Sequence, residues 1–420
     1  MIPYLHAKEL LLARAGAVRP VMLPLDQAAG RVAAAPVAAA FPVPSFHNSA
    51  MDGFALAADA AAGAKPEQPL RLPVAAVAAA GGGPALWRPG AVVQIMTGAA
   101  LPPGPDTVVP IENVTVERGG DGVAQAITLT APLRPGSHIR RQGEDFAVGD
   151  PLLAAGERIT PHQIMALAAL GVGRVMVAAA PLLTVLATGD EVRPVTADHD
   201  GAPPGGDAIF NANSPYLLAA AGLWGAETED GGQVPDTRAA FAQALRGLMA
   251  RNRPGRVVLS TGAVSKGEFD FVPDALADVG AEILFHRAAI RPGKPILFAL
   301  LPGGIPFFGL PGNPISAAVG FRFFVVPLLR ARLGLPPEMP WRLPLARPHA
   351  VKPGYTVFLK AALSIGGGGT PRVEILPGQE SFRIRPMLAA NGWVAWGESC
   401  SELESGHLVD FYPAFPQTVA

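Results

Sequence analysis

The 420-residue sequence contains a single cysteine, Cys400, and has no excess of either charge. One cysteine cannot form an internal disulfide, and it excludes a zinc site built from several thiolates. Its 33 lysines and arginines against 34 aspartates and glutamates give a formal net charge of -1, which offers no support for nucleic-acid binding. We therefore expect a cytoplasmic protein with no nucleic-acid partner.

The sequence also lacks an uninterrupted hydrophobic run of membrane-spanning length. The apolar stretch 164–188 is broken by two glycines, an arginine and Pro181. At the start, MIPYLHAKELLLARAG carries Lys8, Glu9 and Arg14 among apolar residues, which is typical of an amphipathic helix and not of a secretion signal. These features predict a protein that does not engage a membrane.

Several catalytic signatures are missing as well. No histidine pair has metal-ligand spacing, and no Gly-x-Ser-x-Gly motif occurs. Gly262 and Gly267 are spaced as in a P-loop, but Glu268 and Phe269 follow where Lys and Ser or Thr are required. Zinc hydrolysis, serine-based acyl transfer and Walker-type nucleotide binding are therefore poorly supported.

Glycine and proline are abundant, with 48 and 45 residues, and 50% of the residues are hydrophobic. Short β-branched segments between turns predict a small inserted β domain, whereas strands alternate with helices from 181 to 334. That alternation predicts a mainly parallel sheet with helices on both faces. After residue 335 the pattern returns to β, as in a small barrel or sandwich. The predicted domains are 1–47 with 148–178, 48–147, 179–334 and 335–420.

Three polar or glycine-rich loops follow predicted strands of the α/β region. They are Thr188-Gly189-Asp190-Glu191, Thr261-Gly262-Ala263-Val264-Ser265 and Leu310-Pro311-Gly312-Asn313. Because parallel strands end at one edge of their sheet, these loops are expected to meet and to bind a ligand there. Asn313 can cap a helix that Pro314 begins, and the backbone N–H groups of such a start attract anions.

A cationic segment lies between two of these loops in the sequence. Arg287, Arg291 and Lys294 surround a Pro-Gly pair that fixes the backbone. Arginine offers planar, bidentate contacts to oxyanions, and lysine adds a point charge. The combination suits a phosphate-rich or oxyanion ligand.

Carboxylates near the same loops are candidate Mg²⁺ ligands. Asp190 and Glu191 follow a predicted strand, and Asp270 follows the second loop. Mg²⁺ takes one or two protein carboxylates together with water and substrate phosphate. The alternatives are a solvent-facing turn for the first two residues and a helix cap for Asp270.

Two loops of the first half are unusual. Asn48-Ser49-Ala50-Met51-Asp52-Gly53 gathers polar groups before a glycine, and local chemistry alone favours an ordinary Asx turn. In 138–146, two arginines lie beside Glu144 and Asp145. This loop is either a surface salt-bridge cluster or a ligand-facing loop, and its residues leave both interpretations open.

Together these segments resemble the MoeA-type molybdopterin molybdenumtransferases, the family that includes the E domain of gephyrin. The similar motifs are NSAMDGFA (48–55), RRQGEDF (140–146), ATGDEV (187–192), STGAVSKGEFDF (260–271), RPGKP (291–295) and FGLPGNPISA (308–317). They occur in family order across nearly the whole chain, which makes the resemblance highly specific. It implies an elongated helical/β part, an inserted β domain, a MoaB/MogA-like molybdopterin-binding α/β domain and a C-terminal β-barrel-like domain.

The resemblance also implies a reaction and an assembly. Molybdate is inserted into adenylylated molybdopterin with Mg²⁺, and AMP is released. The family forms homodimers in which the α/β domain of one subunit faces the inserted β domain of the other. A molybdopterin adenylyltransferase and molybdoenzyme apoproteins are possible further partners.

Residue roles follow from the matched motifs. Asp190, Glu191 and Asp270 are expected to hold the metal, and Asp52 and Asp145 are expected to position metal or substrate from the inserted domain. The expected catalytic residues are therefore Asp52, Asp145, Asp190 and Asp270. The expected substrate-binding residues are Thr188, Gly189, Ser260, Thr261, Gly262, Ser265, Arg287, Arg291, Lys294, Pro311, Gly312, Asn313 and Ser316.

Three departures from the family pattern bear on these roles. Asn211 stands where an acidic residue is usual, Arg287 and Arg291 replace frequent lysines, and Ser381 lies in an altered motif that leaves its role in doubt. Two other functions stay open: a non-catalytic molybdopterin-binding or scaffold protein, and a paralogue dedicated to one molybdoenzyme.

Overall fold

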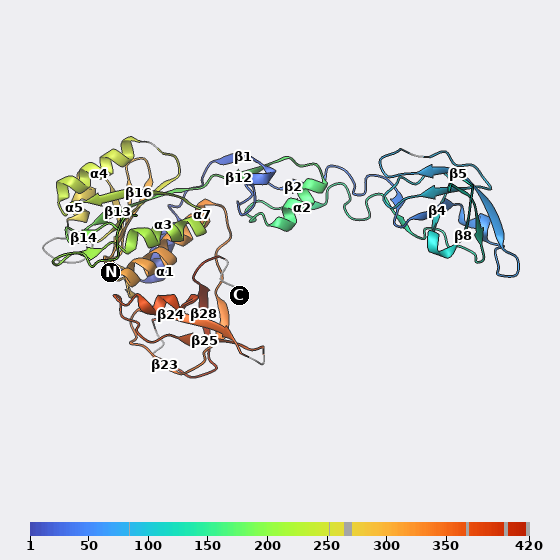
Figure 1. Cartoon of the computed structure of the whole chain (residues 1–420). Helices are drawn as coiled ribbons and strands as arrows, with labels where there is room; N and C mark the ends of the chain where they lie inside the picture. Colours follow the sequence, from blue (N-terminus) through green and yellow to red (C-terminus); the bar gives the residue numbers. More distant parts are fainter. Residues whose placement is uncertain (84, 252, 264–270, 367–368, 399–401, 417–420) are drawn as a thin grey trace. The chain divides into compact units, whose positions relative to one another are not determined.

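The computed structural model describes residues 1–83, 85–251, 253–263, 271–366, 369–398 and 402–416 (Figure 1). The predicted site residues Ser265 and Asp270 lie outside the described residues. The chain forms two compact units, which are coarser than the four predicted domains. The first unit is Met1–Ala35, Ala155–Ile159 and Arg174–Ala420, and the second is Pro36–Ala154 and Thr160–Gly173.

A six-stranded sheet with the order β16-β13-β17-β21-β20-β18 forms the centre of the first unit. Its strands are β13 Leu182–Thr188, β16 Glu227–Val234, β17 Arg256–Thr261, β18 Glu282–His286, β20 Leu297–Leu301 and β21 Ile305–Leu310. Strands β16, β13, β17 and β21 pair in parallel, while β20 and β18 are antiparallel additions. The predicted mainly parallel α/β sheet is confirmed.

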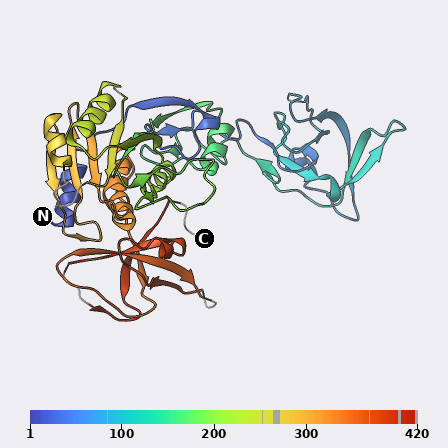
Figure 2. The ribbon, with the colours of Figure 1, turned by 60° about the vertical axis from the view of Figure 1, so that its left-hand side comes forward.

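Helices cover both faces of this sheet, as the sequence pattern predicts (Figures 1 and 2). Val257 and Phe308 point into a core shared with α3 (Asn213–Leu223) and the segment after Asn313. Val258 and Phe307 point into the opposite core, formed with α4 (Arg238–Ala250) and α5 (Val272–Asp278). Successive residues of a strand face opposite sides, so apolar runs without alternation are what a doubly covered sheet requires.

The edge strand β16 is absent from the sequence-based prediction. Its sequence, ETEDGGQV, is polar and contains two glycines, and most of its residues are exposed. An edge strand pairs with only one other strand, and most side chains of β16 face solvent. Because these side chains are polar, the hydrophobic pattern of the sequence does not predict a strand here.

The segment after Asn313 is one continuous helical stretch with an irregular centre. It comprises α6 (Pro314–Gly320), a π-helix (Phe321–Val325) and α7 (Val326–Arg332). Pro314–Arg332 is long and apolar enough to cross a membrane, but 78% of its most apolar window is buried within the fold. We interpret it as a core helix.

A second six-stranded sheet of the first unit has the order β19-β24-β26-β28-β22, with β25 paired to β24. Its strands are β19 Ile290–Arg291, β22 Trp341–Pro344, β24 Thr356–Ile365, β25 Pro371–Ile375, β26 Gly392–Trp396 and β28 Leu408–Pro413. Strand β19 comes from the α/β region and pairs in parallel with β24. The C-terminal sheet is therefore joined to the predicted cationic segment by backbone hydrogen bonds.

The amino-terminal residues complete the first unit. Helix α1 (Tyr4–Leu12) lies within the predicted amphipathic segment at the start of the chain and packs against α7. Strand β1 (Pro20–Pro24) pairs antiparallel with β12 (Arg174–Ala178), which brings residues on either side of the second unit's sequence together.

The second unit contains a six-stranded sheet with the order β7-β4-β6-β5-β9-β8. Its strands are β4 Gly53–Leu56, β5 Leu70–Ala78, β6 Val92–Ile95, β7 Thr107–Pro110, β8 Thr115–Arg118 and β9 Ala124–Leu129. Short pairs join β2 (Val37–Ala38) to β11 (Pro151–Leu153) and β3 (Asn48–Ser49) to β10 (Ile139–Arg140). Helix α2 (Pro161–Ala169) begins at a proline and carries a Thr160–Gln163 capping box.

Candidate active site

Three loops meet at the carboxyl edge of the parallel strands. Strands β13, β17 and β21 are neighbours, and Thr261 lies in register with both Ala187 and Leu310. The Thr188 hydroxyl donates to the Thr261 carbonyl at 3.0 Å, and the Gly262 N–H donates to the Leu310 carbonyl at 3.1 Å. The predicted convergence of these loops is confirmed.

The loops approach so closely that glycine is required. Gly262 has φ +96°, and a Cβ there would lie 2.6 Å from the Thr188 hydroxyl oxygen. A Cβ on Gly312 would lie 3.7 Å from the Gly262 Cα. The contact at Gly312 is an ordinary van der Waals distance, so the close approach of the neighbouring loops requires glycine at position 262.

The start of α6, with its cap residue, follows Gly312 directly. We call the neighbouring Gly262 and Gly312 loops the glycine floor. Asn313 occupies the cap position, as predicted, but its side chain makes no capping hydrogen bond. A Cβ on Gly293 would lie 3.3 Å from the Ser316 carbonyl oxygen, and the Ile315 N–H donates to the Ser381 carbonyl at 3.0 Å. The helix start is thus contacted by the cationic segment on one side and by the C-terminal region on the other.

The cationic segment is held by its backbone while its side chains stay unpaired. Arg287 has φ +81°, and its N–H donates to Ile296 at 2.8 Å. Arg291 belongs to β19, and the Lys294 carbonyl accepts from Ala288 at 3.2 Å. Arg291 and Lys294 are exposed, and Arg287 is half-buried. Within the described residues none of these three side chains has an ion pair, so their charges are available to an anionic ligand.

Lys360 is a functional candidate that the sequence prediction missed. Its side chain is fully buried, and the ammonium donates to the carbonyls of Gly378 (2.6 Å), Arg383 (3.2 Å) and Glu380 (3.4 Å). Burial lowers the pKa of Lys360. Its contacts shape the loop 378–383, which presents the Ser381 carbonyl to α6. The available signal was one lysine inside the apolar strand TVFLKAALSI.

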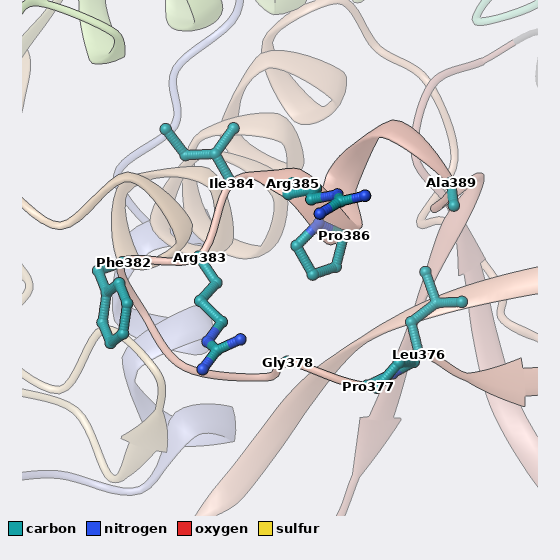
Figure 3. A pocket seen from close by; sticks show the side chains of 9 residues that line it. All are labelled: Leu376, Pro377, Gly378, Phe382, Arg383, Ile384, Arg385, Pro386 and Ala389. Carbon is teal, nitrogen blue, oxygen red and sulfur yellow. The ribbon is translucent and has the colours of Figure 1, made fainter.

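A cavity of about 720 Å³ opens beside this loop (Figure 3). Its walls are mainly apolar, with two arginines among them. The lining residues are Leu376, Pro377, Gly378, Phe382, Arg383, Ile384, Arg385, Pro386 and Ala389. Arg383 pairs with Glu380 at 3.0 Å, whereas Arg385 has no ion pair in the described parts of the chain. Ser381, whose role the sequence left in doubt, contacts the helix start through its backbone carbonyl. The two residues that follow it, Phe382 and Arg383, line this cavity.

The acidic side of the site contains a residue that the sequence prediction missed. The Asp190 N–H donates to Asp236 Oδ2 at 3.3 Å, and the Asp236 N–H donates to Asp190 Oδ1 at 3.4 Å. Asp236 Oδ1 is buried and makes no hydrogen bond. Burial raises the pKa of Asp236, and the neighbouring charges of Asp190 and Glu191 add to that effect. Asp236 follows the overlooked strand β16, which explains the omission.

The carboxylates of Asp190, Glu191 and Asp236 meet some but not all of the requirements of a metal site. A buried carboxylate oxygen without a donor, next to two further carboxylates, is stabilised when a positive ion approaches. Among the described residues, however, no three His, Cys, Asp or Glu side chains are grouped closely enough to hold one metal ion. A site here would be completed by water and substrate oxygens, which is the usual coordination of Mg²⁺.

Asn211, which replaces a usual acidic residue, has a structural partner. Its Oδ1 accepts the Ser214 N–H and its Nδ2 donates to the Ser214 hydroxyl, both at 3.0 Å. These bonds stabilise the first turn of α3 without a charge. The neighbouring Asn213 donates to the Gly312 carbonyl at 2.7 Å, which ties this helix start to the glycine floor.

The second unit brings its two unusual loops together. Pairing of β3 with β10 places Ser49 opposite Ile139. Asp52 is exposed and accepts the Thr97 N–H (2.7 Å) and hydroxyl (2.8 Å), and these bonds lower its pKa. A Cβ on Gly53 would lie 2.0 Å from the Val109 carbonyl oxygen, so this turn requires glycine.

The Arg140–Phe146 loop is ordered by local bonds. Glu144 accepts the Arg141 N–H at 2.7 Å, and the Gln142 N–H donates to His47 Nδ1 at 3.1 Å. Asp145 is exposed. Within the described ranges, no arginine of this loop forms an ion pair with a carboxylate, so the alternative of a surface salt-bridge cluster is not supported. Asp52 and Asp145 belong to the second unit, and every other predicted site residue belongs to the first by sequence.

Comparison with known families accounts for nearly the whole chain. Residues 2–171 match the MoeA N-terminal region (domain I and II), residues 184–331 match a probable molybdopterin binding domain, and residues 342–414 match the MoeA C-terminal region (domain IV). The chain belongs to the MoeA family. The resemblance inferred from six sequence motifs and the multidomain fold that it implied are confirmed.

Relatives and solved structures agree with this assignment. The chain is 36% identical to a molybdopterin molybdenumtransferase of Synechococcus elongatus, with 94% of each chain covered. It is 34% identical to molybdopterin molybdenumtransferase 2 of Mycobacterium tuberculosis, over 93% of this chain and 94% of the relative. A MoeA crystal structure from Pyrococcus horikoshii superposes with a TM-score of 0.81 at 28% identity and covers 99% of both chains. The MoeA family works in molybdenum cofactor biosynthesis, and this protein shares that role.

Proposed function

We propose that this MoeA-family protein inserts molybdenum from molybdate into adenylylated molybdopterin and releases AMP. The single observation that carries the proposal is the meeting of a glycine floor and a helix start at one sheet edge, where the backbone of the cationic segment approaches that helix start at Gly293. Its substrates are multiply anionic, since one is an oxyanion and the other contains a pyrophosphate. Backbone N–H groups and free guanidinium groups are suited to both.

The residues divide the work by chemistry. The Gly262 and Gly312 loops and the start of α6 bind phosphate oxygens, and Arg287, Arg291 and Lys294 bind molybdate or phosphate. Fixed donors aimed at charge that develops on the reacting oxygens are an effective source of rate enhancement. Ser381 and Lys360 shape the wall through which the C-terminal region reaches α6.

We further propose that Asp190 and Asp236 hold Mg²⁺ together with water and substrate phosphate, and that Glu191 contacts the ion through water. The orphaned Asp236 Oδ1 supports this assignment. A bound Mg²⁺ supplies charge neutralisation at the bridging phosphate and at the departing AMP. The predicted ligand Asp270 lies outside the described residues and stays a prediction.

The proposed working form is a homodimer. Asp52 and Asp145 of one subunit's second unit would approach the first unit of the other subunit, as the family resemblance implies. A cytoplasmic location, and a handover to molybdoenzyme apoproteins or from a molybdopterin adenylyltransferase, stay proposals as well.

A reconstituted assay tests the function. The full chain is mixed with adenylylated molybdopterin, Mg²⁺ and molybdate, and AMP is measured over time. We expect AMP release that requires molybdate and disappears in Asp190→Asn. Binding of the pterin nucleotide without AMP release would instead support the scaffold alternative.

A further inference from the structure

A cavity of about 210 Å³ lies elsewhere in the first unit, away from the loops of the candidate site. It is enclosed by α1, the π-helix, the first turns of α7, the residues that follow α7, and β28. None of the residues assigned above to catalysis or substrate binding lines it. A π-helix is a rare irregularity that occurs frequently at functional sites, and here it contributes Arg322 to the cavity wall.

One charged pair in this wall is already neutral. Arg322 donates to both Glu338 carboxylate oxygens, at 2.8 and 2.6 Å, and to the Pro413 carbonyl at 3.0 and 3.1 Å. Its guanidinium also lies 4.8 Å from the centre of the Trp224 ring. Because Glu338 is engaged by Arg322 in a bidentate pair, it cannot fully neutralise other cations nearby.

Two further cations in the same wall lack a matching anion. Lys8 has no hydrogen-bond or ion-pair partner within the part of the chain that the structure describes. Arg330 donates from one terminal nitrogen to the Pro336 carbonyl at 2.8 Å, but its Nε is buried without any partner. Burial lowers the pKa of both side chains, and each also senses the charges of Glu338 and Arg322. The cavity therefore holds a positive excess that has been partly removed from water.

The rest of the wall is apolar and aromatic. Tyr4 packs edge-on against Phe358 and Phe324, with ring centres 5.2 and 5.5 Å apart, so its ring is fixed. Phe323 and Tyr412 meet edge-on at 5.4 Å. Fixed rings beside desolvated cations favour a flat apolar body that carries a negative group, since such a ligand satisfies both parts of the wall.

We propose that this cavity binds a small aromatic carboxylate, with its carboxylate between Lys8 and Arg330 and its ring against Tyr4, Phe323 and Tyr412. The uncompensated charge sets the sign of the ligand. The cavity volume and the rigid aromatic walls set its size and shape. The ligand is distinct from the multiply anionic substrates of the sheet edge, which need many donors and offer little apolar surface.

Benzoate is a suitable probe, and benzamide is its uncharged counterpart of the same shape. Binding to the full-length protein is measured by calorimetry and by ligand-observed NMR. We expect benzoate to bind and benzamide to bind at least about tenfold more weakly. Lys8→Gln should lower benzoate affinity about tenfold, and Lys8→Gln with Arg330→Gln should abolish binding, because a charge-assisted hydrogen bond is lost each time.

Two matched variants separate this cavity from other cationic surfaces. Lys352→Gln removes an exposed lysine of the C-terminal region, and Lys294→Gln removes a cation of the sheet-edge site. Both should bind benzoate as the unaltered protein does. The proposal is overturned if benzoate shows no binding, if benzamide binds equally well, or if the Lys8 and Arg330 variants keep full affinity. Molybdate-dependent AMP release is measured separately, so failure of either proposal can be recognised without the other.

Discussion

At the scale of single residues, Asp236 makes the sharpest contribution to the proposed metal site. Its pKa is raised because burial and two neighbouring carboxylates oppose its ionisation. Ionisation of such a group disfavours the folded state above its folded pKa, and an approaching cation removes that disadvantage. The ionisation of Asp236 should therefore affect both the Mg²⁺ affinity and the stability of the protein, and both should depend on pH.

We predict that Asp236→Asn lowers Mg²⁺ affinity by at least about tenfold and raises the thermal midpoint of the metal-free protein. The amide keeps an oxygen that can accept the Asp190 N–H but carries no charge. In the unaltered protein, Mg²⁺ affinity should fall with acidification at a higher pH than an ordinary aspartate would cause, since the pKa of Asp236 is raised. Thermal unfolding with and without Mg²⁺ across pH measures each effect. An unchanged Mg²⁺ response in the variant contradicts the assignment.

Lys360 is a second residue with a defined prediction. Lys360→Met removes the donor for three loop carbonyls and should destabilise the protein by about 2–4 kcal/mol, because buried acceptors lose their partner. It should also reduce AMP release more than pterin-nucleotide binding, since the loop that contacts α6 is loosened. Urea unfolding and the AMP assay provide the two readouts. Lys352→Met, at an exposed position, is the control and should change neither.

At the scale of elements, the glycine turns after β17 and β21 depend on close backbone approach. Gly262→Ala places a methyl group 2.6 Å from the Thr188 hydroxyl oxygen at φ +96°. The loop must shift, so we predict a loss of pterin-nucleotide affinity of about tenfold or more, together with lower stability.

Gly303→Ala is a matched control for this substitution. Gly303 has φ +84° in the turn between β20 and β21, and a Cβ there meets nothing within 4 Å. It should therefore lower stability through backbone strain while leaving nucleotide affinity unchanged. Equal loss of affinity in both variants, measured by fluorescence titration, would show that general strain and not the loop contact is responsible.

The elements also show what could be predicted from the sequence. Strands β13, β17 and β21 are apolar runs that end in glycine or polar turns, so the strands and the meeting of their loops could be predicted. Strand β16 is polar because it lies at an edge, and Asp236 was overlooked with it. Lys360 was overlooked because its role depends on carbonyls that approach from a distant loop, which no local pattern records.

At the scale of the whole molecule, the site residues are divided between two units. Asp52 and Asp145 are in the second unit, whereas the sheet-edge loops and the cationic segment are in the first. Asp52 is exposed, and its carboxylate accepts two hydrogen bonds from Thr97 of its own unit, which fix the side chain at the surface.

Mixed dimers test whether Asp52 of one subunit contributes to the site of the other subunit. Asp52→Asn and Asp190→Asn chains are each expected to be inactive alone. If each site uses both subunits, unfolding and refolding the two variants together should restore about a quarter of normal activity, since half of the dimers then contain one intact site. Light scattering establishes the dimer, and AMP release measures recovery. No recovery from a mixture shown to contain heterodimers would contradict a shared site.

The pairing of β19 with β24 has a consequence for how this enzyme could be shortened. Ile290 and Arg291 pair through backbone hydrogen bonds with β24, the strand that begins at Thr356. Removal of the carboxyl-terminal sheet would take away the strand that pairs with Arg291, and it would expose Phe323, whose ring packs against Phe358 and Trp393. We therefore expect that truncation before this sheet yields neither a pterin-binding fragment nor a catalyst, because the two sheets share one hydrophobic core.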